Sequence, residues 1–184
     1  MMAQDSKLIF VLGGARAGKS GFALRLAEES ASQVCFIATA QALDEEMANR
    51  IKRHREERPA HWTTIEEPYQ LDTALLEASA SQLVIVDCLT LFVSNWLLRS
   101  DNEIQCEEIV RSISQDFLAT LKSERRTAIC VSNEVGLGVI PETRLGRTFR
   151  DLLGRVNQQF AEAADEVYLL VAGLPLRLKP HGFD

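Results

Sequence analysis

Four residues near the start of the chain have the types and spacing of a phosphate-binding turn. The pattern G-x-x-x-x-G-K-[ST] is matched by Gly13, Gly18, Lys19 and Ser20. In such a turn the backbone N–H groups converge on an anion, and the two glycines remove side chains that would block its approach. Lys19 would reach the β- and γ-phosphates of a nucleotide, and the Ser20 hydroxyl would ligate magnesium. The turn therefore predicts a nucleotide site.

The residues on either side predict the elements that must hold this turn. Residues 8–12 are five consecutive apolar residues, as expected of a parallel strand buried on both faces. Apolar positions between Phe22 and Ala27 can line a helix that begins near Gly18. An ordinary glycine turn with a surface lysine is the alternative, and the coincidence of strand, loop and helix argues against it.

Asp87 is the next candidate, because it ends the apolar run 83–86. A P-loop protein needs an acid at such a strand end to hold magnesium. The alternative is an acid that only marks the strand end or caps a helix starting at Leu89.

Asn133 and Glu134 follow the apolar run 128–131 in the same way. Ligands of parallel sheets collect at the carboxyl ends of the strands, so both residues should face the same crevice. They could bind substrate, or they could build a turn before Gly136.

A basic segment spans residues 50–62, where five of thirteen residues are basic in a chain with a net charge of −6. His54 lies among four arginines, Arg50, Arg53, Arg55 and Arg58. Helical periodicity places His54 with the apolar positions Leu43 and Met47, away from bulk water. A packed core histidine is one interpretation. A histidine that attacks phosphorus, in a positive field that holds phosphates near the ring, is the other. His61 and His181 lack this setting, and we interpret both as structural.

The hydrophobic pattern predicts strands that alternate with helices. The expected strands are 8–12, 34–38, 62–65, 83–86, 128–131, 166–171 and 174–178. The expected helices begin near residue 18 and cover 43–57, 69–78, 89–98, 103–123 and about 141–164, the last starting at Pro141-Glu142. This order favours an α/β fold with a mostly parallel sheet, helices on both faces and a C-terminal pair of strands. We expect one domain over residues 1–184.

Composition narrows the class of protein. The negative net charge argues against a nucleic-acid binder, whose phosphate contacts demand a basic face. Cys35, Cys88, Cys106 and Cys130 lack C-x-x-C spacing and are expected to be buried, reduced thiols. No apolar run approaches the length that crosses a bilayer, and no signal-like segment opens the chain, so we expect a cytoplasmic protein.

Together, these stretches resemble the bifunctional adenosylcobinamide kinase and adenosylcobinamide-phosphate guanylyltransferase family of cobalamin biosynthesis, over nearly the whole chain. The matching stretches are 13–20 (GGARAGKS), 37–40 (IATA), 50–62 with 66–68 (EEP), 86–95 (VDCLTLFVSN), 132–138 (SNEVGLG), 149–151 (FRD), 154–158 (GRVNQ) and 164–167 (ADEV). Some members carry a second histidine where this chain has Arg53, which leaves His54 as the nucleophile candidate. The departures, an extension before Lys7 and a tail after Lys179, touch no motif.

The resemblance implies two reactions. The γ-phosphoryl group of GTP or ATP passes to the aminopropanol hydroxyl of adenosylcobinamide. GMP from GTP is then placed on His54 and transferred to adenosylcobinamide phosphate, giving adenosylcobinamide-GDP and pyrophosphate.

The resemblance also implies a RecA-like P-loop fold, a homotrimer, Mg²⁺, and catalytic roles for His54 and Lys19. Magnesium would be held by Ser20 and Asp87. The implied nucleotide-binding residues are Gly13, Gly14, Ala15, Arg16, Ala17, Gly18, Lys19, Ser20, Ala38, Thr39, Ala40, Arg55, Glu56, Glu57, Arg58, Glu66 and Asp87.

Two other classes remain open from the residues alone. One is a simple P-loop small-molecule kinase, in which the arginines of residues 50–58 clamp the acceptor and His54 only packs. The other is a nucleotide switch of the RecA type, against which the acidic charge counts. Incubation with GTP labelled in the α-phosphate would distinguish the simple kinase from a guanylyltransferase, because only the guanylyltransferase should become labelled.

Overall fold

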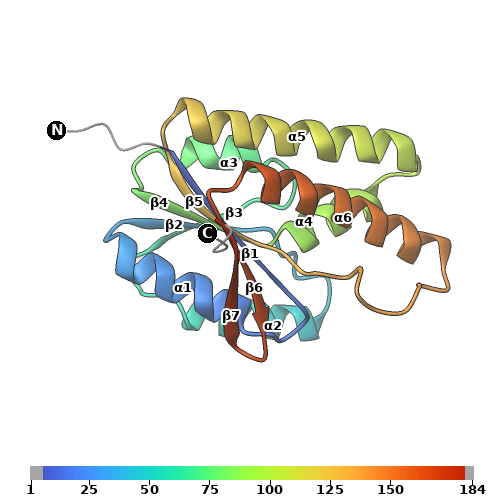
Figure 1. Cartoon of the computed structure of the whole chain (residues 1–184), viewed down its shortest axis with the longest axis horizontal. Helices are drawn as coiled ribbons and strands as arrows, with labels where there is room; N and C mark the ends of the chain where they lie inside the picture. Colours follow the sequence, from blue (N-terminus) through green and yellow to red (C-terminus); the bar gives the residue numbers. More distant parts are fainter. Residues whose placement is uncertain (1–5, 181–184) are drawn as a thin grey trace.

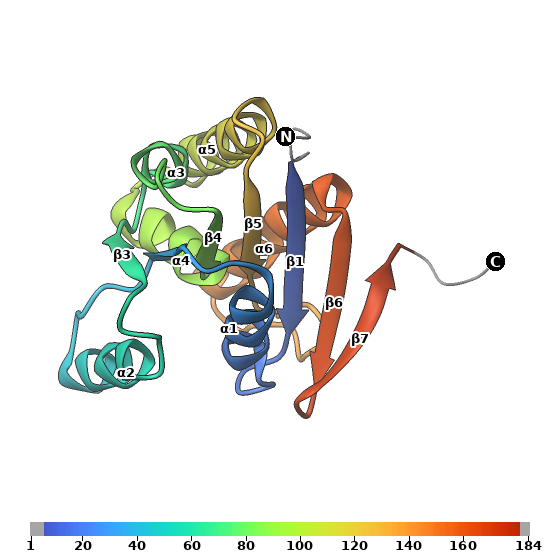
Figure 2. The ribbon, with the colours of Figure 1, turned by 90° about the vertical axis from the view of Figure 1, so that its left-hand side faces the viewer.

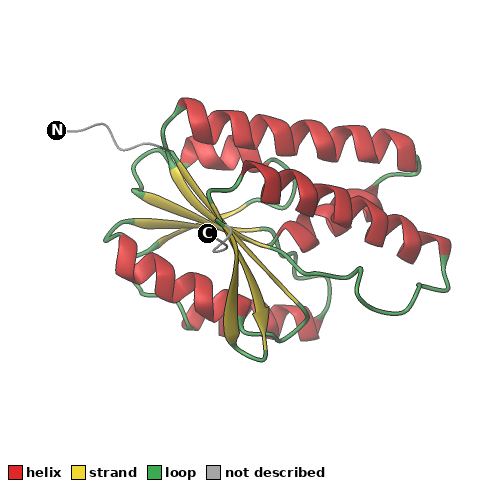
Figure 3. Ribbon diagram, viewed as in Figure 1, coloured by secondary structure: helices red, strands yellow, loops and turns green. Residues whose placement is uncertain are grey.

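The computed structural model describes residues 6–180, and a seven-stranded sheet forms its centre (Figures 1 and 3). The strands are β1 (Lys7–Gly13), β2 (Val34–Ala38), β3 (Thr63–Glu66), β4 (Leu83–Asp87), β5 (Thr127–Val131), β6 (Glu166–Val171) and β7 (Leu174–Lys179). Their order across the sheet is β3-β2-β4-β5-β1-β6-β7. Neighbouring strands run parallel except β6 and β7, which run antiparallel. The predicted α/β fold, with its mostly parallel sheet and C-terminal pair of strands, is confirmed.

Side chains of the central strands alternate between two hydrophobic layers. On β1, Leu8, Phe10 and Leu12 pack into one layer, while Ile9 and Val11 pack into the other. This alternation explains the continuous apolar run in the sequence, since a strand covered on both faces has no side left for polar residues.

The helices divide unequally between the two faces (Figures 1 and 2). On one side lie α1 (Lys19–Ser30) and α2 (Glu45–Glu56), and on the other lie α3 (Leu71–Glu77), α4 (Leu89–Arg99), α5 (Glu103–Ser123) and α6 (Arg144–Ala163). Helix α1 packs against the sheet through Phe22, Ala23 and Ala27. Helix α2 contributes no buried residue and lies beside β3, the edge strand (Figure 2).

The expected start of the last helix is wrong by three residues. Helix α6 begins at Arg144, and the Thr143 hydroxyl caps it by accepting a hydrogen bond from the Gly146 N–H at 3.1 Å. The Arg147 guanidinium folds back and donates to the carbonyl oxygens of Pro141, at 3.0 Å, and Glu142, at 2.7 Å. Residues 141–143 are therefore a fixed loop and not the first helical turn.

Three of the four cysteines, Cys35, Cys106 and Cys130, are buried, and all four are free thiols, as predicted. Cys88 is only half-buried, which corrects the expectation for that residue. His181 lies outside the described residues. Within residues 6–180, no helix combines the length and apolar character needed to cross a bilayer.

Candidate active site

The turn between β1 and α1 has the backbone geometry of a phosphate cradle. Gly13 has φ 155° and Gly18 has φ 92°, a region that side chains disfavour. A Cβ on Gly13 would also lie 2.6 Å from the carbonyl oxygen of Leu170. Gly14, Ala15 and Arg16 are exposed at the tip of the turn, so an anion can reach their backbone. We call residues 13–20 the phosphate loop.

Lys19 lies beneath this loop and is buried. Its ammonium group donates a hydrogen bond to the carbonyl oxygen of Gly14 at 2.7 Å, so the cation is held inside the turn. Burial lowers the pKa of Lys19 below its ordinary value, and the charge of Arg50 lowers it further, whereas Asp87 opposes the shift. Because an anion would replace water around this ammonium, the lysine suits phosphate binding.

Ser20 and Asp87 meet at the carboxyl end of β4. The Ser20 hydroxyl donates a hydrogen bond to Oδ2 of Asp87 at 2.8 Å. A hydroxyl and a carboxylate are hard oxygen donors, and Mg²⁺ in nucleotide sites is commonly held by one or two protein oxygens together with phosphates and water. The pair fits magnesium, and the two predicted metal ligands lie side by side.

The end of β2 is joined to the end of β4 by a buried threonine. The hydroxyl of Thr39 donates to the carbonyl oxygen of Cys88 and accepts from the Cys88 N–H, both at 2.8 Å. The Asn95 side-chain amide donates to the carbonyl oxygens of Thr39, at 2.8 Å, and Pro68, at 3.2 Å. Residues 38–40 are thus fixed next to Asp87. Burial raises the pKa of the Cys88 thiol to about 11, so Cys88 stays protonated at neutral pH.

The end of β5 is fixed by a second side-chain amide. The Asn157 amide donates to the carbonyl oxygen of Asn133 at 3.0 Å, and its Oδ1 accepts from the Ser132 hydroxyl at 2.7 Å. The Glu134 N–H donates to the carbonyl oxygen of Gly13 at 3.1 Å. Its carboxylate accepts from the Gly136 N–H at 2.5 Å. In this structure Glu134 builds the turn, one of the two roles open from the sequence.

Asn95 and Asn157 were missed as site residues by sequence reasoning. Both are buried, Asn95 in the apolar helix α4 and Asn157 next to Val156 on the buried side of α6. A polar amide in such a stretch was the available signal, because a buried amide must find hydrogen-bond partners.

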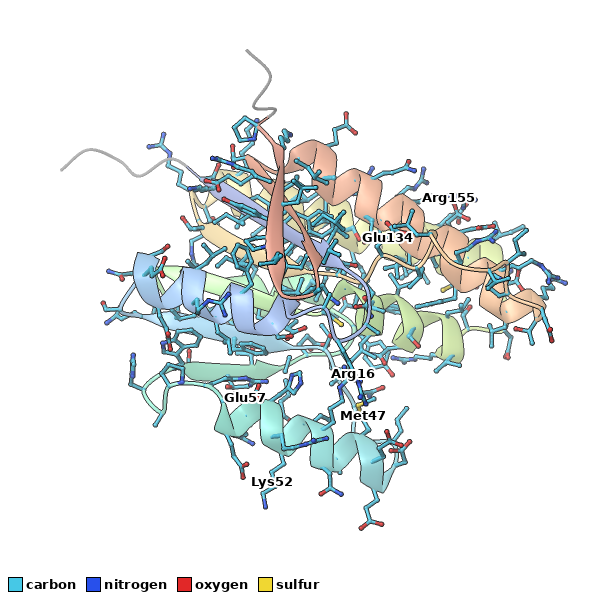
Figure 4. The ribbon with its side chains drawn as sticks, turned by 60° about the horizontal axis from the view of Figure 1, so that its bottom comes forward. Arg16, Met47, Lys52, Glu57, Glu134 and Arg155 are labelled. Carbon is cyan, nitrogen blue, oxygen red and sulfur yellow. The ribbon has the colours of Figure 1, made fainter. Side chains whose placement is uncertain are left out.

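Helix α2 carries His54 on its half-buried side, with Met47 and Ile51, as the periodicity predicts. His54 is less buried than the sequence predicts. No residue of α2 is buried, and Leu43, before the start of the helix, is exposed. In residues 6–180, no hydrogen bond or ion pair involves His54. In the view of Figure 4, Met47 lies on the side of α2 toward the phosphate loop, where Arg16 is labelled, while Lys52 points away from the sheet.

Arg58 is the most enclosed arginine of the basic segment. Its guanidinium stacks over the Phe36 ring, 3.5 Å from the centroid, and donates from Nη1 to the Thr64 hydroxyl at 3.4 Å. Its Nε is buried and has no hydrogen-bond partner. Burial lowers the pKa of Arg58, and Asp87 is near enough to oppose that shift. Arg58 therefore faces the same strand ends as Lys19.

The other candidates of this segment lie in solvent. Arg55 and Glu66 approach at 3.7 Å and are both mostly exposed. Glu56 and Glu57 are exposed, and so is His61, which therefore has no packing role. The structure thus gathers residues 13–20, 38–40, Asp87 and Arg58 at one edge of the sheet, and it leaves Glu56 and Glu57 at the surface of α2.

Comparison with known proteins finds a family model that matches most of the chain. The model of a family described as cobinamide kinase / cobinamide phosphate guanyltransferase, CobU, matches residues 9–178. The bifunctional adenosylcobalamin biosynthesis protein CobU of Escherichia coli K12 is 41% identical over 181 residues, covering 94% of this chain and 99% of that protein. The corresponding protein CobP of Pseudomonas aeruginosa is 48% identical over 170 residues, covering 92% and 95%.

Among solved structures, the KaiC-like protein PH0186 of Pyrococcus horikoshii OT3 has a TM-score of 0.48 at 16% identity, covering 90% of this chain and 71% of that one. This similarity is too low to support any conclusion about fold or function beyond the strand order described above.

Proposed function

The chain belongs to the cobinamide kinase / cobinamide phosphate guanyltransferase family, and we propose that it performs both reactions on adenosylcobinamide. The observation that carries the kinase is the meeting of Lys19, Ser20 and Asp87 at one strand end. The phosphate loop binds the triphosphate of GTP or ATP, and Lys19 neutralises charge on the transferring group. Magnesium, when bound through Ser20 and Asp87, supplies further charge stabilisation.

The second reaction is proposed to use His54. A ring nitrogen of His54 attacks the α-phosphorus of GTP, the bond from that phosphorus to the bridging oxygen breaks, and pyrophosphate leaves. An oxygen of adenosylcobinamide phosphate then attacks the same phosphorus and releases the histidine. Arg55 follows His54 directly in α2 and Arg58 lies two residues after the end of the helix. Their charges would stabilise the departing pyrophosphate. The remaining proposed nucleotide contacts lie in residues 13–20, 38–40, 56–57, Glu66 and Asp87.

Labelling tests the histidine. Incubation with GTP labelled in the α-phosphate should leave acid-labile label on the unmodified protein and none on His54→Ala. His54→Ala should still convert adenosylcobinamide to its phosphate, because the kinase needs no covalent histidine. His61→Ala, an exposed histidine a few residues away, is the matched control and should keep both reactions.

A simple small-molecule kinase is the second candidate, and the absence of hydrogen bonds and ion pairs to His54 among residues 6–180 favours it. If the unmodified protein takes no label while phosphorylating cobinamide, or if His54→Ala still forms the GDP product at a normal rate, that candidate or direct transfer replaces the proposal.

We further propose one domain, a homotrimer and a cytoplasmic location. Exposed leucines at positions 174, 176 and 178 lie on β7, an edge strand, and support self-association of this kind. Sedimentation of the purified chain tests the trimer, and cell fractionation tests the location.

A further inference from the structure

The segment between Glu134 and α6 exposes apolar side chains next to the active site. We call residues 136–143 the apolar loop. Leu137 is 85% exposed, Val139 is 94% exposed and Ile140 is 70% exposed. In Figure 1 this connection from β5 to α6 runs below α6, away from the sheet and toward the start of that helix. Three neighbouring apolar residues left in water are a common sign of a binding surface.

Hydrogen bonds fix the apolar loop at both ends. At its start, the Glu134 N–H is bonded to Gly13, and the Glu134 carboxylate accepts from the Gly136 N–H. At its end, the Arg147 guanidinium donates to two loop carbonyl oxygens. Gly146 is also closely packed there, since a Cβ would lie 2.8 Å from the Cβ of Pro141. The exposed residues between these anchors are therefore presented on a braced platform.

The α6 end is braced a second time, against α5. The Arg144 guanidinium contacts the Glu103 carboxylate at 3.1 Å, and the Thr148 hydroxyl donates to the same carboxylate at 3.2 Å. These contacts do not serve to complete the hydrophobic core, because Leu137, Val139 and Ile140 pack into neither hydrophobic layer. They suit a surface that receives a ligand.

Charge separates the two sides of the active site. Residues 133–143 contain Glu134 and Glu142 and no lysine or arginine. The two arginines that follow are engaged, Arg144 with the Glu103 carboxylate and Arg147 with the carbonyl oxygens of residues 141 and 142. The basic segment on and after α2 carries Arg50, Arg53, Arg55 and Arg58, together with Glu56 and Glu57. Figure 4 shows Glu134 at the α6 side of the molecule and Met47 of α2 at the opposite side of the phosphate loop, represented by Arg16. An acceptor with an apolar, cationic body would be oriented by this difference, and its phosphorylated product would be oriented by its anionic end as well.

We propose that the apolar loop supports the corrin ring of adenosylcobinamide, an inference that rests on the proposed function. The acceptor hydroxyl must reach the γ-phosphate in the phosphate loop, and the macrocycle attached to it is too large to follow into a turn of eight residues. The ring must therefore rest on a surface beside that turn. Its methyl-bearing faces match Leu137, Val139 and Ile140, and the cationic cobalt matches the acidic character of residues 133–143.

Substitution of all three apolar residues tests the proposal. In Leu137→Ser/Val139→Ser/Ile140→Ser, corrinoid affinity should fall about tenfold or more, equivalent to about 1.4 kcal/mol of lost apolar contact. Equilibrium dialysis of cobinamide, followed by its visible absorbance, measures this without turnover. The KM for adenosylcobinamide in the kinase assay should rise in parallel, while the KM for GTP and the melting temperature stay unchanged.

Leu76→Ser is the matched control, since Leu76 is also exposed but lies on α3, close to the amino end of β4. It should leave corrinoid affinity unchanged. Unchanged affinity in the triple variant overturns the inference, and so does a smaller native mass, which would make the loop a contact between copies of the chain. If instead the unmodified protein fails to phosphorylate adenosylcobinamide, the proposed function itself fails.

Discussion

The phosphate loop and helix α2 carry the two proposed chemistries, and they are built differently. Lys19 of the phosphate loop is buried, and both Lys19 and Ser20 hydrogen-bond to protein oxygens at 2.7 and 2.8 Å. The loop is also tied to its surroundings, because the Gly173 N–H donates to the carbonyl oxygen of Ala17 at 3.0 Å. Helix α2 has no buried residue, and His54 has no hydrogen bond within the described part of the chain.

This difference suggests that the two proposed reactions need different degrees of fixation of their side chains. Phosphoryl transfer depends on the positions of charges around the phosphoryl group as it is transferred. The residues of the phosphate loop are therefore held in place by the sheet before a nucleotide binds. A nucleophilic histidine depends on its own ring and on nearby cations, and it can be carried by an exposed helix. Variants in the two regions should therefore fail in different ways.

The largest effect is expected from Lys19→Ala. This change removes the buried cation from the transferring group, and by analogy with loss of one transition-state donor the kinase rate should fall about 10²–10³-fold. A steady-state kinase assay with adenosylcobinamide and GTP measures it, and nucleotide binding should weaken as well. A rate within a few-fold of that of the unmodified protein would contradict the role of the phosphate loop in phosphoryl transfer. The proposed difference between this loop and α2 would then be lost.

A smaller and more specific effect is expected from Asp87→Asn, which keeps the shape of the side chain and removes its charge. The kinase should need a higher magnesium concentration for half-maximal rate, because one anionic oxygen beside Ser20 is lost. The measurement is a magnesium titration at fixed GTP. Glu46→Gln, an exposed carboxylate near the start of α2 and outside the proposed nucleotide contacts, is the matched control and should not move the titration. An identical shift in both variants counts against a metal role for Asp87.

The smallest effect compares the stability of the two regions. Gly13→Ala should lower the free energy of unfolding by about 2–4 kcal/mol, because the new Cβ meets the Leu170 carbonyl and the backbone is strained. Ala48→Gly, on exposed α2, should cost about 1 kcal/mol or less, the usual helix-propensity difference. Urea unfolding followed by circular dichroism measures both. Equal losses would mean that α2 is held as tightly as the phosphate loop.

The fold could be predicted closely wherever a hydrophobic run had clear limits. Strands β2 and β6 and helix α5 have the expected bounds, since an unbroken apolar or periodic stretch leaves little choice of period. The start of α6 was missed because Pro141 is as favourable at a first helical position as Thr143 is at a cap. The structure favours the cap at Thr143, because the Arg147 side chain donates hydrogen bonds to the carbonyl oxygens of residues 141 and 142.

The candidate site was predictable where a motif fixes the backbone and less so elsewhere. The spacing of Lys19 and Ser20 after Gly13 specifies a local turn, and Asp87 could be placed because it ends an apolar strand. The tie from Asn95 to Thr39 joins residues 56 positions apart, and no local pattern encodes such a pairing. For His54 the periodicity gave the correct side of the helix, but it could not tell how far α2 lies from the core.

The position of β5 between β1 and β4 sets the length of the phosphate loop. Two interstrand spacings, about 10 Å, separate the strand that enters the loop from the strand that ends in Asp87. The chain must cross the end of β5 and start α1 with Ser20 directed at Asp87. One inserted residue would rotate the Ser20 side chain by about 100° around the axis of α1 and turn the hydroxyl away. The spacing of the strands thus fixes the length of the loop, so a change of length should misplace Ser20 even where the residue types of the turn are kept.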